Sequence, residues 1–122
     1  MQTNFENLQI YQLAERLADM IWEIVIAWDY FAKDTVGKQI VRAADSVGAN
    51  IAEGSGKGTD QDLRRFLPIA CGSLYETKHW LKRAYKRGLI LRTQIEELKP
   101  LLDELLPKLN AYLRSLNRKL NT

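Results

Sequence analysis

The chain has 122 residues, 46% of them hydrophobic, so we expect one domain over residues 1–122 whose core needs neither a disulfide nor a metal. Its net charge is only +3, but residues 35–92 carry 11 basic and 5 acidic side chains, which makes the middle of the chain electropositive. A single cysteine excludes an internal disulfide, the lack of an 18-residue apolar run excludes a membrane span, and no basic leader precedes the first apolar run, so we expect a cytoplasmic protein.

The first two predicted helices are marked by apolar residues at spacings of three and four. The first apolar stripe consists of Ile10, Leu13, Leu17, Ile21, Ile24, Trp28 and Phe31. The segment DYFAKDTVGK interrupts it, and Asp34 or Thr35 is the expected N-cap of the next helix. The second stripe is made mostly of small residues, which predicts close helix packing: Ile40, Ala43, Ala44, Val47 and Ile51.

Three glycines follow the second stripe, at positions 54, 56 and 58. They do not match a Walker loop, and they follow a helix where a phosphate-binding loop follows a strand. We therefore expect Gly54 to end the second helix as its left-handed C-cap, followed by a flexible turn.

The third and fourth predicted helices complete the chain. The third begins at Thr59 or Asp60, ends near Gly88 and contains Pro68, which predicts a kink or a locally unwound turn. Its apolar side consists of Leu63, Phe66, Ala70, Leu74, Thr77, Leu81 and Ala84. The fourth carries a heptad seam of Ile95, Leu98, Leu102, Leu105, Leu109, Tyr112 and Leu116. Pro100 and Pro107 are expected to bend it or mark its first turns, and the final RKLNT to fray.

Four long helices joined by short loops predict an all-α, up-down-up-down antiparallel four-helix bundle. Further apolar and aromatic residues lie off the core stripes, which favours a subunit interface and therefore self-association. They are Tyr11, Trp22, Val25, Ile69, Trp80, Tyr85, Leu106 and Leu113.

Two segments, QIVRAADSVGANIAEGSGKGT and RRFLPIACGSLYETKHWLKRAYKRGLI, resemble the four helix bundle proteins also called 23S rRNA intervening-sequence proteins. The resemblance extends from the first helix to about Leu116, and Pro68 departs from it. It is strongest at Arg42, Ala43, Ser46, Asn50, Ile51, Ala52, Glu53, Gly54, Phe66, Gly72, Ser73 and Glu76.

The resemblance implies a small bacterial protein, first recognised as a reading frame within insertions in ribosomal RNA genes, that forms a ring-like homopentamer without an established enzymatic activity. A similar fold serves as the accessory protein of diversity-generating retroelements, which binds nucleic acid and a reverse transcriptase. By this more distant analogy, an unknown protein such as a reverse transcriptase is a further candidate partner.

A polar set lies beside the core stripe of the second helix. One helix face carries Arg42, Ser46, Asn50 and Glu53, and Glu76 can reach it from the third helix. The favoured interpretation is a structural network with an ion pair from Arg42 to Glu76 or Glu53, because an unpaired buried charge is costly. The alternative is that Glu53 and Glu76 form a general acid/base or metal pair.

No catalytic or metal-binding motif is present, so we expect no enzyme, metal or cofactor. The only histidine, His79, is outside any EXXH motif, and Cys71 has no CXXC partner and is expected in the core or an interface. Ser73 lacks the GXSXG elbow and is better explained as a helix contact.

A basic run on the third helix is the best functional candidate. Its residues are Lys78, Lys82, Arg83, Lys86 and Arg87, with Arg64 expected on the same side two turns upstream and Arg92 after the helix end. Such a face can neutralise phosphates of RNA or DNA, although a solvated cationic face is equally ordinary. In a ring, repeated weak contacts would add.

Three functions stay open: an oligomeric adaptor that binds nucleic acid through phosphates, a protein-interaction scaffold that presents the acidic first helix or the turn after Gly54, and an enzyme. We expect the adaptor.

Overall fold

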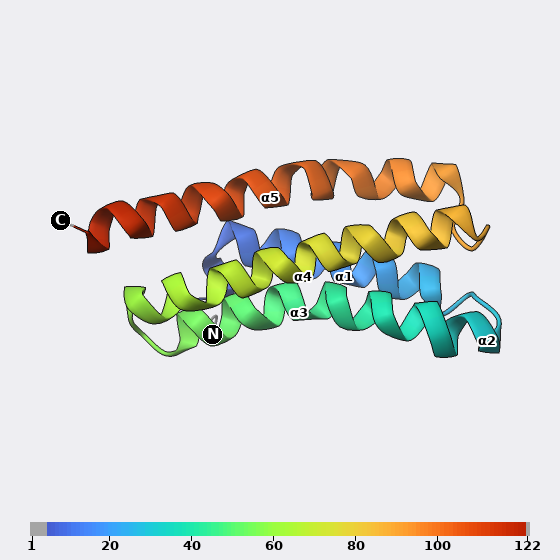
Figure 1. Ribbon diagram of the computed structural model, residues 1–122, viewed down its shortest axis with the longest axis horizontal. Coiled ribbons are helices and arrows are strands. Elements are labelled where there is room, and N and C mark those ends of the chain that lie inside the picture. Colours follow the sequence, from blue (N-terminus) through green and yellow to red (C-terminus); the bar gives the residue numbers. More distant parts are fainter. Residues whose placement is uncertain (1–4, 122) are drawn as a thin grey trace.

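The computed structural model describes residues 5–121, and within this range all regular structure is helical. Four long helices alternate in direction along the bundle (Figure 1): α1 (Gln9–Val25), α3 (Lys38–Gly56), α4 (Asp60–Lys86) and α5 (Arg92–Leu120). A 3-10 turn, η1 (Phe5–Asn7), precedes α1. Helices α1 and α4 each pack against both α3 and α5. The predicted up-down-up-down bundle is confirmed.

The break between the first two long helices differs from the prediction. Asp29 is the N-cap, and its Oδ1 accepts a hydrogen bond of 2.9 Å from the backbone N–H of Ala32 in the short α2 (Tyr30–Ala32). The expected caps Asp34 and Thr35 instead lie in a π-helical turn, η2 (Lys33–Gly37), that leads directly into α3. The predicted caps were wrong because the helical stretch starts about one turn earlier, at the first side chain able to cap it.

The core follows the predicted stripes in the middle of each helix and departs from them near the ends. All five predicted residues of α3 are buried, but Phe31 is exposed, Phe66 is half-buried, and Val25, expected at an interface, belongs to the core. Leu67 and Leu101 are buried although neither was predicted. A stripe drifts around a helix over several turns, so core positions change by one residue toward the ends.

Gly54 does not terminate α3. The helix continues to Gly56, and the left-handed residue of the following turn is Gly58, with φ of +88°. Gly54 is instead buried against α4, where an added Cβ would lie 2.8 Å from the Cβ of Phe66. The C-cap prediction for Gly54 is therefore wrong, because this glycine permits close approach of two helices instead of ending one of them.

Neither the internal prolines nor the C-terminal tail interrupts the helices. Helix α4 continues through Pro68, and α5 continues through Pro100 and Pro107 to Leu120, so a locally unwound turn in α4 and fraying at residues 118–120 are not observed. The tail is held in part by an ion pair of 2.5 Å between Lys119 Nζ and Asp60 Oδ2 at the start of α4. Thr122 lies outside the described residues.

Candidate nucleic-acid interface

The outer face of α4 carries the predicted basic run. The helix starts at Thr59, whose Oγ1 accepts a 3.1 Å bond from the backbone N–H of Asp62, and ends before Gly88, with φ of +74°. Its other side is buried in the core, which directs the basic residues outward. Lys82, Lys86 and Arg87 are exposed, and Lys78 and Arg83 are half-buried.

These five cations have no acidic partner in the part of the chain that the structure describes. Ion pairs neutralise Lys38, Arg65, Arg92, Lys99 and Lys108, each through a carboxylate three or four residues away. Within residues 5–121, no ion pair involves Lys78, Lys82, Arg83, Lys86 or Arg87. We call these five residues the basic face. It presents positive charge that the fold does not neutralise.

One edge of the basic face borders a groove of about 600 Å³ between α4 and α5. Lys78, Lys82 and Tyr85 line its α4 side. On the α5 side, Glu96 pairs with Arg92 at 3.5 Å and Asp103 with Lys99 at 2.8 Å. The α5 carboxylates are thus already paired along their own helix, which leaves the α4 lysines available to a ligand.

Arg64 lies on the same side of α4 as this face, about five whole turns before Lys82, but far from it along the helix. It precedes Lys78 by 14 residues, roughly four turns instead of the expected two. It lines a separate hollow near the start of α4, with Gln61, Asp62 and Arg65. Arg64 would therefore contact only a ligand that extends along most of the helix.

The structure brings together only part of the predicted polar set. The Nδ2 of Asn50 donates to the carbonyl and the Oγ of Ser46 at 2.8 and 3.0 Å, and the Oγ of Ser73 on α4 donates to that same Ser46 Oγ at 2.9 Å. This cluster joins α3 to α4.

The charged members of that set remain outside the cluster. Arg42 is exposed and donates to Gln39 on its own helix at 2.6 Å. Among the described residues it pairs with neither Glu53 nor Glu76, so the predicted ion pair is not observed. Glu53 is also exposed, and an exposed carboxylate needs no buried partner.

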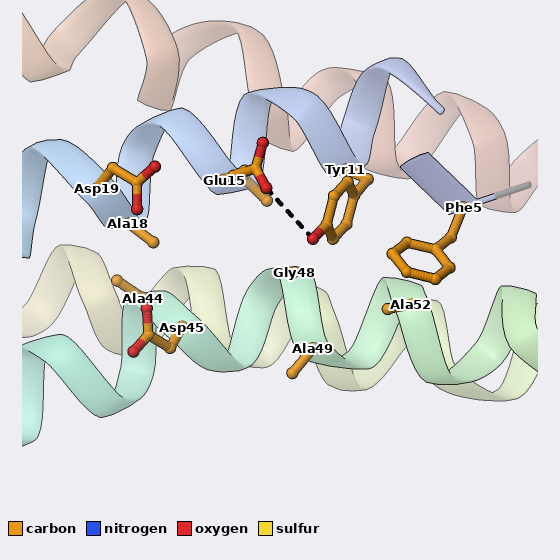
Figure 2. Close-up of a pocket in the computed structure, with 11 residues that line it drawn as sticks. Phe5, Tyr11, Glu15, Ala18, Asp19, Ala44, Asp45, Gly48, Ala49 and Ala52 are labelled. Atoms are coloured by element: carbon orange, nitrogen blue, oxygen red, sulfur yellow. Dashed lines mark hydrogen bonds between the residues drawn. The ribbon is translucent and has the colours of Figure 1, made fainter. Parts of the chain in front are cut away.

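Sequence reasoning missed an acidic groove between α1 and α3, about 330 Å³ in volume. Alanine residues of both helices and a glycine of α3 line the groove, together with the carboxylates of Glu15, Asp19 and Asp45 (Figure 2). The Tyr11 hydroxyl donates to Glu15 Oε2 at 3.4 Å. Desolvation and then the nearby Asp19 charge raise the pKa of Asp45. The stripe of small residues on α3 could have indicated this groove from the sequence. Its position opposite the acidic residues of α1, however, depends on how the two helices pack.

Residues 6–111 match the sequence profile of a family described as 23S rRNA-intervening sequence protein. The chain belongs to this family. The resemblance inferred from the two motif segments is thereby confirmed.

A solved structure supports the assignment to the 23S rRNA-intervening sequence family. It is a protein of unknown function from the S23 ribosomal protein family of Bacteroides thetaiotaomicron, which is 25% identical to this chain. The match covers 85% of this chain and 97% of the other, with a TM-score of 0.74. No curated protein matches the chain.

Within residues 5–121, no three His, Cys, Asp or Glu side chains lie close enough together to hold a metal ion. Cys71 is half-buried, its Sγ lies 3.8 Å from Asn110 Oδ1, and burial raises the pKa of the thiol, which disfavours the nucleophilic thiolate. No helix within residues 5–121 is long and apolar enough to cross a membrane.

Proposed function

We propose that this member of the 23S rRNA-intervening sequence family is a non-enzymatic, self-associating adaptor that binds RNA or DNA through the phosphate backbone. The observation that carries the proposal is the basic face of α4, whose five cations have no carboxylate partner within the described chain. Phosphate contacts release counterions and need no base-specific geometry, so such a face suffices for sequence-independent binding.

Self-association would strengthen these contacts. Trp22, Ile69 and Tyr85 remain 52%, 48% and 47% exposed on the single chain, and large apolar side chains in such positions favour a subunit interface. In a closed ring, which by family resemblance would be a pentamer, each basic face is repeated, and several weak phosphate contacts act together.

The test is binding of a fluorescent structured RNA and a duplex DNA at several salt concentrations, with subunit number measured by light scattering on the same samples. We expect the logarithm of the association constant to fall linearly with the logarithm of salt. Absence of binding at low salt by an intact oligomer would contradict the proposal.

A charge-matched pair of variants assigns the binding to α4. Changing Lys82, Arg83, Lys86 and Arg87 to Gln removes four unpaired cations. Changing Lys38, Arg65, Lys99 and Lys108 to Gln removes four that are held in ion pairs. The net charge falls equally in both, so only the first should lose binding if the basic face is the site.

A second candidate function is a scaffold for a protein partner, favoured by the acidic groove between α1 and α3. Asp19 and Asp45 face each other across it (Figure 2), and a basic helix would relieve their repulsion. Capture of a basic protein that weakens as salt is raised, with no nucleic-acid binding, would support this function over the adaptor.

A further inference from the structure

A hollow of about 350 Å³ lies at the end of the bundle where α4 passes into α5. Its lining comes from two separate parts of the chain: the segment around α2 contributes Phe31 and Val36, and the α4–α5 connection contributes Arg87 and Leu89. Figure 1 shows α2 at the same end of the molecule as this connection. The hollow therefore combines an aromatic ring with a cation of the basic face.

Phe31 is held outside the core by its backbone. Asp29 caps α2 ahead of it, and the Oγ1 of Thr35 donates to the carbonyl of Phe31 at 2.7 Å. The neighbouring Ala32 and Val36 are buried, whereas the Phe31 side chain is 76% exposed. An aromatic ring fixed in solvent on an ordered helical backbone indicates a binding contact.

Apolar exposure is concentrated at this end. Tyr30 and Leu91 are 77% and 64% exposed, close in sequence to the Phe31 and Leu89 that line the hollow. Base stacking needs such flat apolar surface next to a cationic path for the backbone.

Charge decides which occupant fits. The basic face extends along α4 to Lys86 and Arg87 at the end of the helix, and Arg87 lines the hollow. None of the cations of the basic face takes part in an ion pair within the described residues. Asp29 is the one acidic residue of the lining, and its Oδ1 already accepts from Ala32. A phosphate is thus favoured on the Arg87 side, and an uncharged planar group on the Phe31 side.

We propose that this hollow binds an unpaired nucleotide, with its base stacked on Phe31 and its phosphate on Arg87. The inference rests on the proposed nucleic-acid function and deepens it. The basic face would hold any nucleic acid, whereas the hollow would select single strands, loops or ends, because a duplex hides the faces of its bases between neighbours.

The experiment compares a fluorescent 12-nucleotide single-stranded RNA with a blunt duplex of the same sequence, using the intact chain at low salt. We expect the single strand to bind more tightly. Phe31→Leu keeps the position apolar but removes the ring, and should weaken single-strand binding about 5- to 150-fold with the duplex unchanged. Phe31→Trp should retain the preference.

Tyr75→Leu is the matched control, since Tyr75 is a 58% exposed aromatic residue that lies on α4 outside the lining of the hollow. It should leave the preference for the single strand over the duplex unchanged. Light scattering on each variant separates loss of stacking from loss of assembly.

The outcomes separate the two proposals. If the wild type binds neither RNA, the proposed function fails and this inference fails with it. If it binds both equally and Phe31→Leu changes nothing, the function survives and the inference is overturned. A lower subunit number in Phe31→Leu would assign the ring to a subunit interface and also overturn it.

Discussion

A Cβ added to Gly54, near the C-terminal end of α3, would lie 2.8 Å from the Cβ of Phe66 near the start of α4. It would also lie 3.2 Å from the Cα of Leu63, which belongs to the α4 backbone and cannot rotate away. The two helices therefore approach at a distance that only glycine allows.

Gly54→Ala should lower the free energy of unfolding. Overpacking costs about 1–3 kcal/mol, and the better helix propensity of alanine returns roughly 1 kcal/mol. We expect a net loss of up to about 2 kcal/mol by urea denaturation. Gly72→Ala on α4 is the control, because a Cβ there meets nothing within 4 Å, and it should stabilise by about 0.5–1 kcal/mol. Equal effects at both sites would contradict the close approach.

Lys82 and Lys99 face the same groove but differ in pairing, since Lys99 Nζ lies 2.8 Å from Asp103 Oδ2. If the basic face binds phosphates, Lys82→Ala should make the salt dependence of RNA binding shallower by about one unit of slope. Lys99→Ala should change it little. Fluorescence titrations at four or five salt concentrations measure both slopes. A larger change of slope for Lys99→Ala than for Lys82→Ala would show that the basic face is not the phosphate-binding surface.

Ser46 should matter more to stability than Arg42. Ser46→Ala removes the Oγ that accepts from both Asn50 and Ser73, and each lost hydrogen bond is worth roughly 1 kcal/mol. Arg42→Ala loses only an exposed contact to Gln39 and should stay within about 0.5 kcal/mol of wild type. A double-mutant cycle between Ser46 and Ser73 should give a coupling energy, and additive effects would show that this contact contributes nothing.

Asp45→Asn should stabilise the protein at neutral pH. Desolvation and the Asp19 charge raise the pKa of Asp45 above its ordinary value, so its ionised form is disfavoured in the folded state. The folded chain holds this proton more readily, and the penalty disappears as the pH falls and Asp45 becomes neutral.

The expected gain for Asp45→Asn at pH 7 is roughly 0.2–1 kcal/mol, because solvent screens the exposed pair. Thermal unfolding at pH 7 and pH 3 should show the gain shrinking at the lower pH. The same gain at both values would mean that removal of the charge is not its cause.

Cys71 should react slowly with thiol reagents in the folded protein. Burial raises its pKa above the ordinary value of 9.0, so the folded state keeps its proton where the unfolded state loses it. Stability should therefore fall as the pH rises past that ordinary value. The raised pKa is checked by measuring the reaction rate against pH with and without denaturant. Identical profiles would show that folding does not shield the thiol from solvent.

The sequence by itself determined the four long helices and the family. Apolar residues at spacings of three and four indicated α1, α3, α4 and α5, because burial of one helix face is a local requirement visible in one dimension. Thr59 was recognised as a cap for the same reason, since it bonds within its own turn.

Only the tertiary structure decided what happens between helices. Gly54 was interpreted as a helix end because the sequence cannot show that Phe66 lies against it. Arg42 was expected to pair with Glu76 on α4 or with Glu53 on its own helix, yet its exposed position lets water solvate the charge. The groove lined by Asp19 and Asp45, and the hollow lined by Phe31 and Arg87, are each formed by segments distant along the chain. Contacts between helices depend on the rotation of each helix about its axis and on the distance between the helices. Both are determined by the packing of many side chains at once.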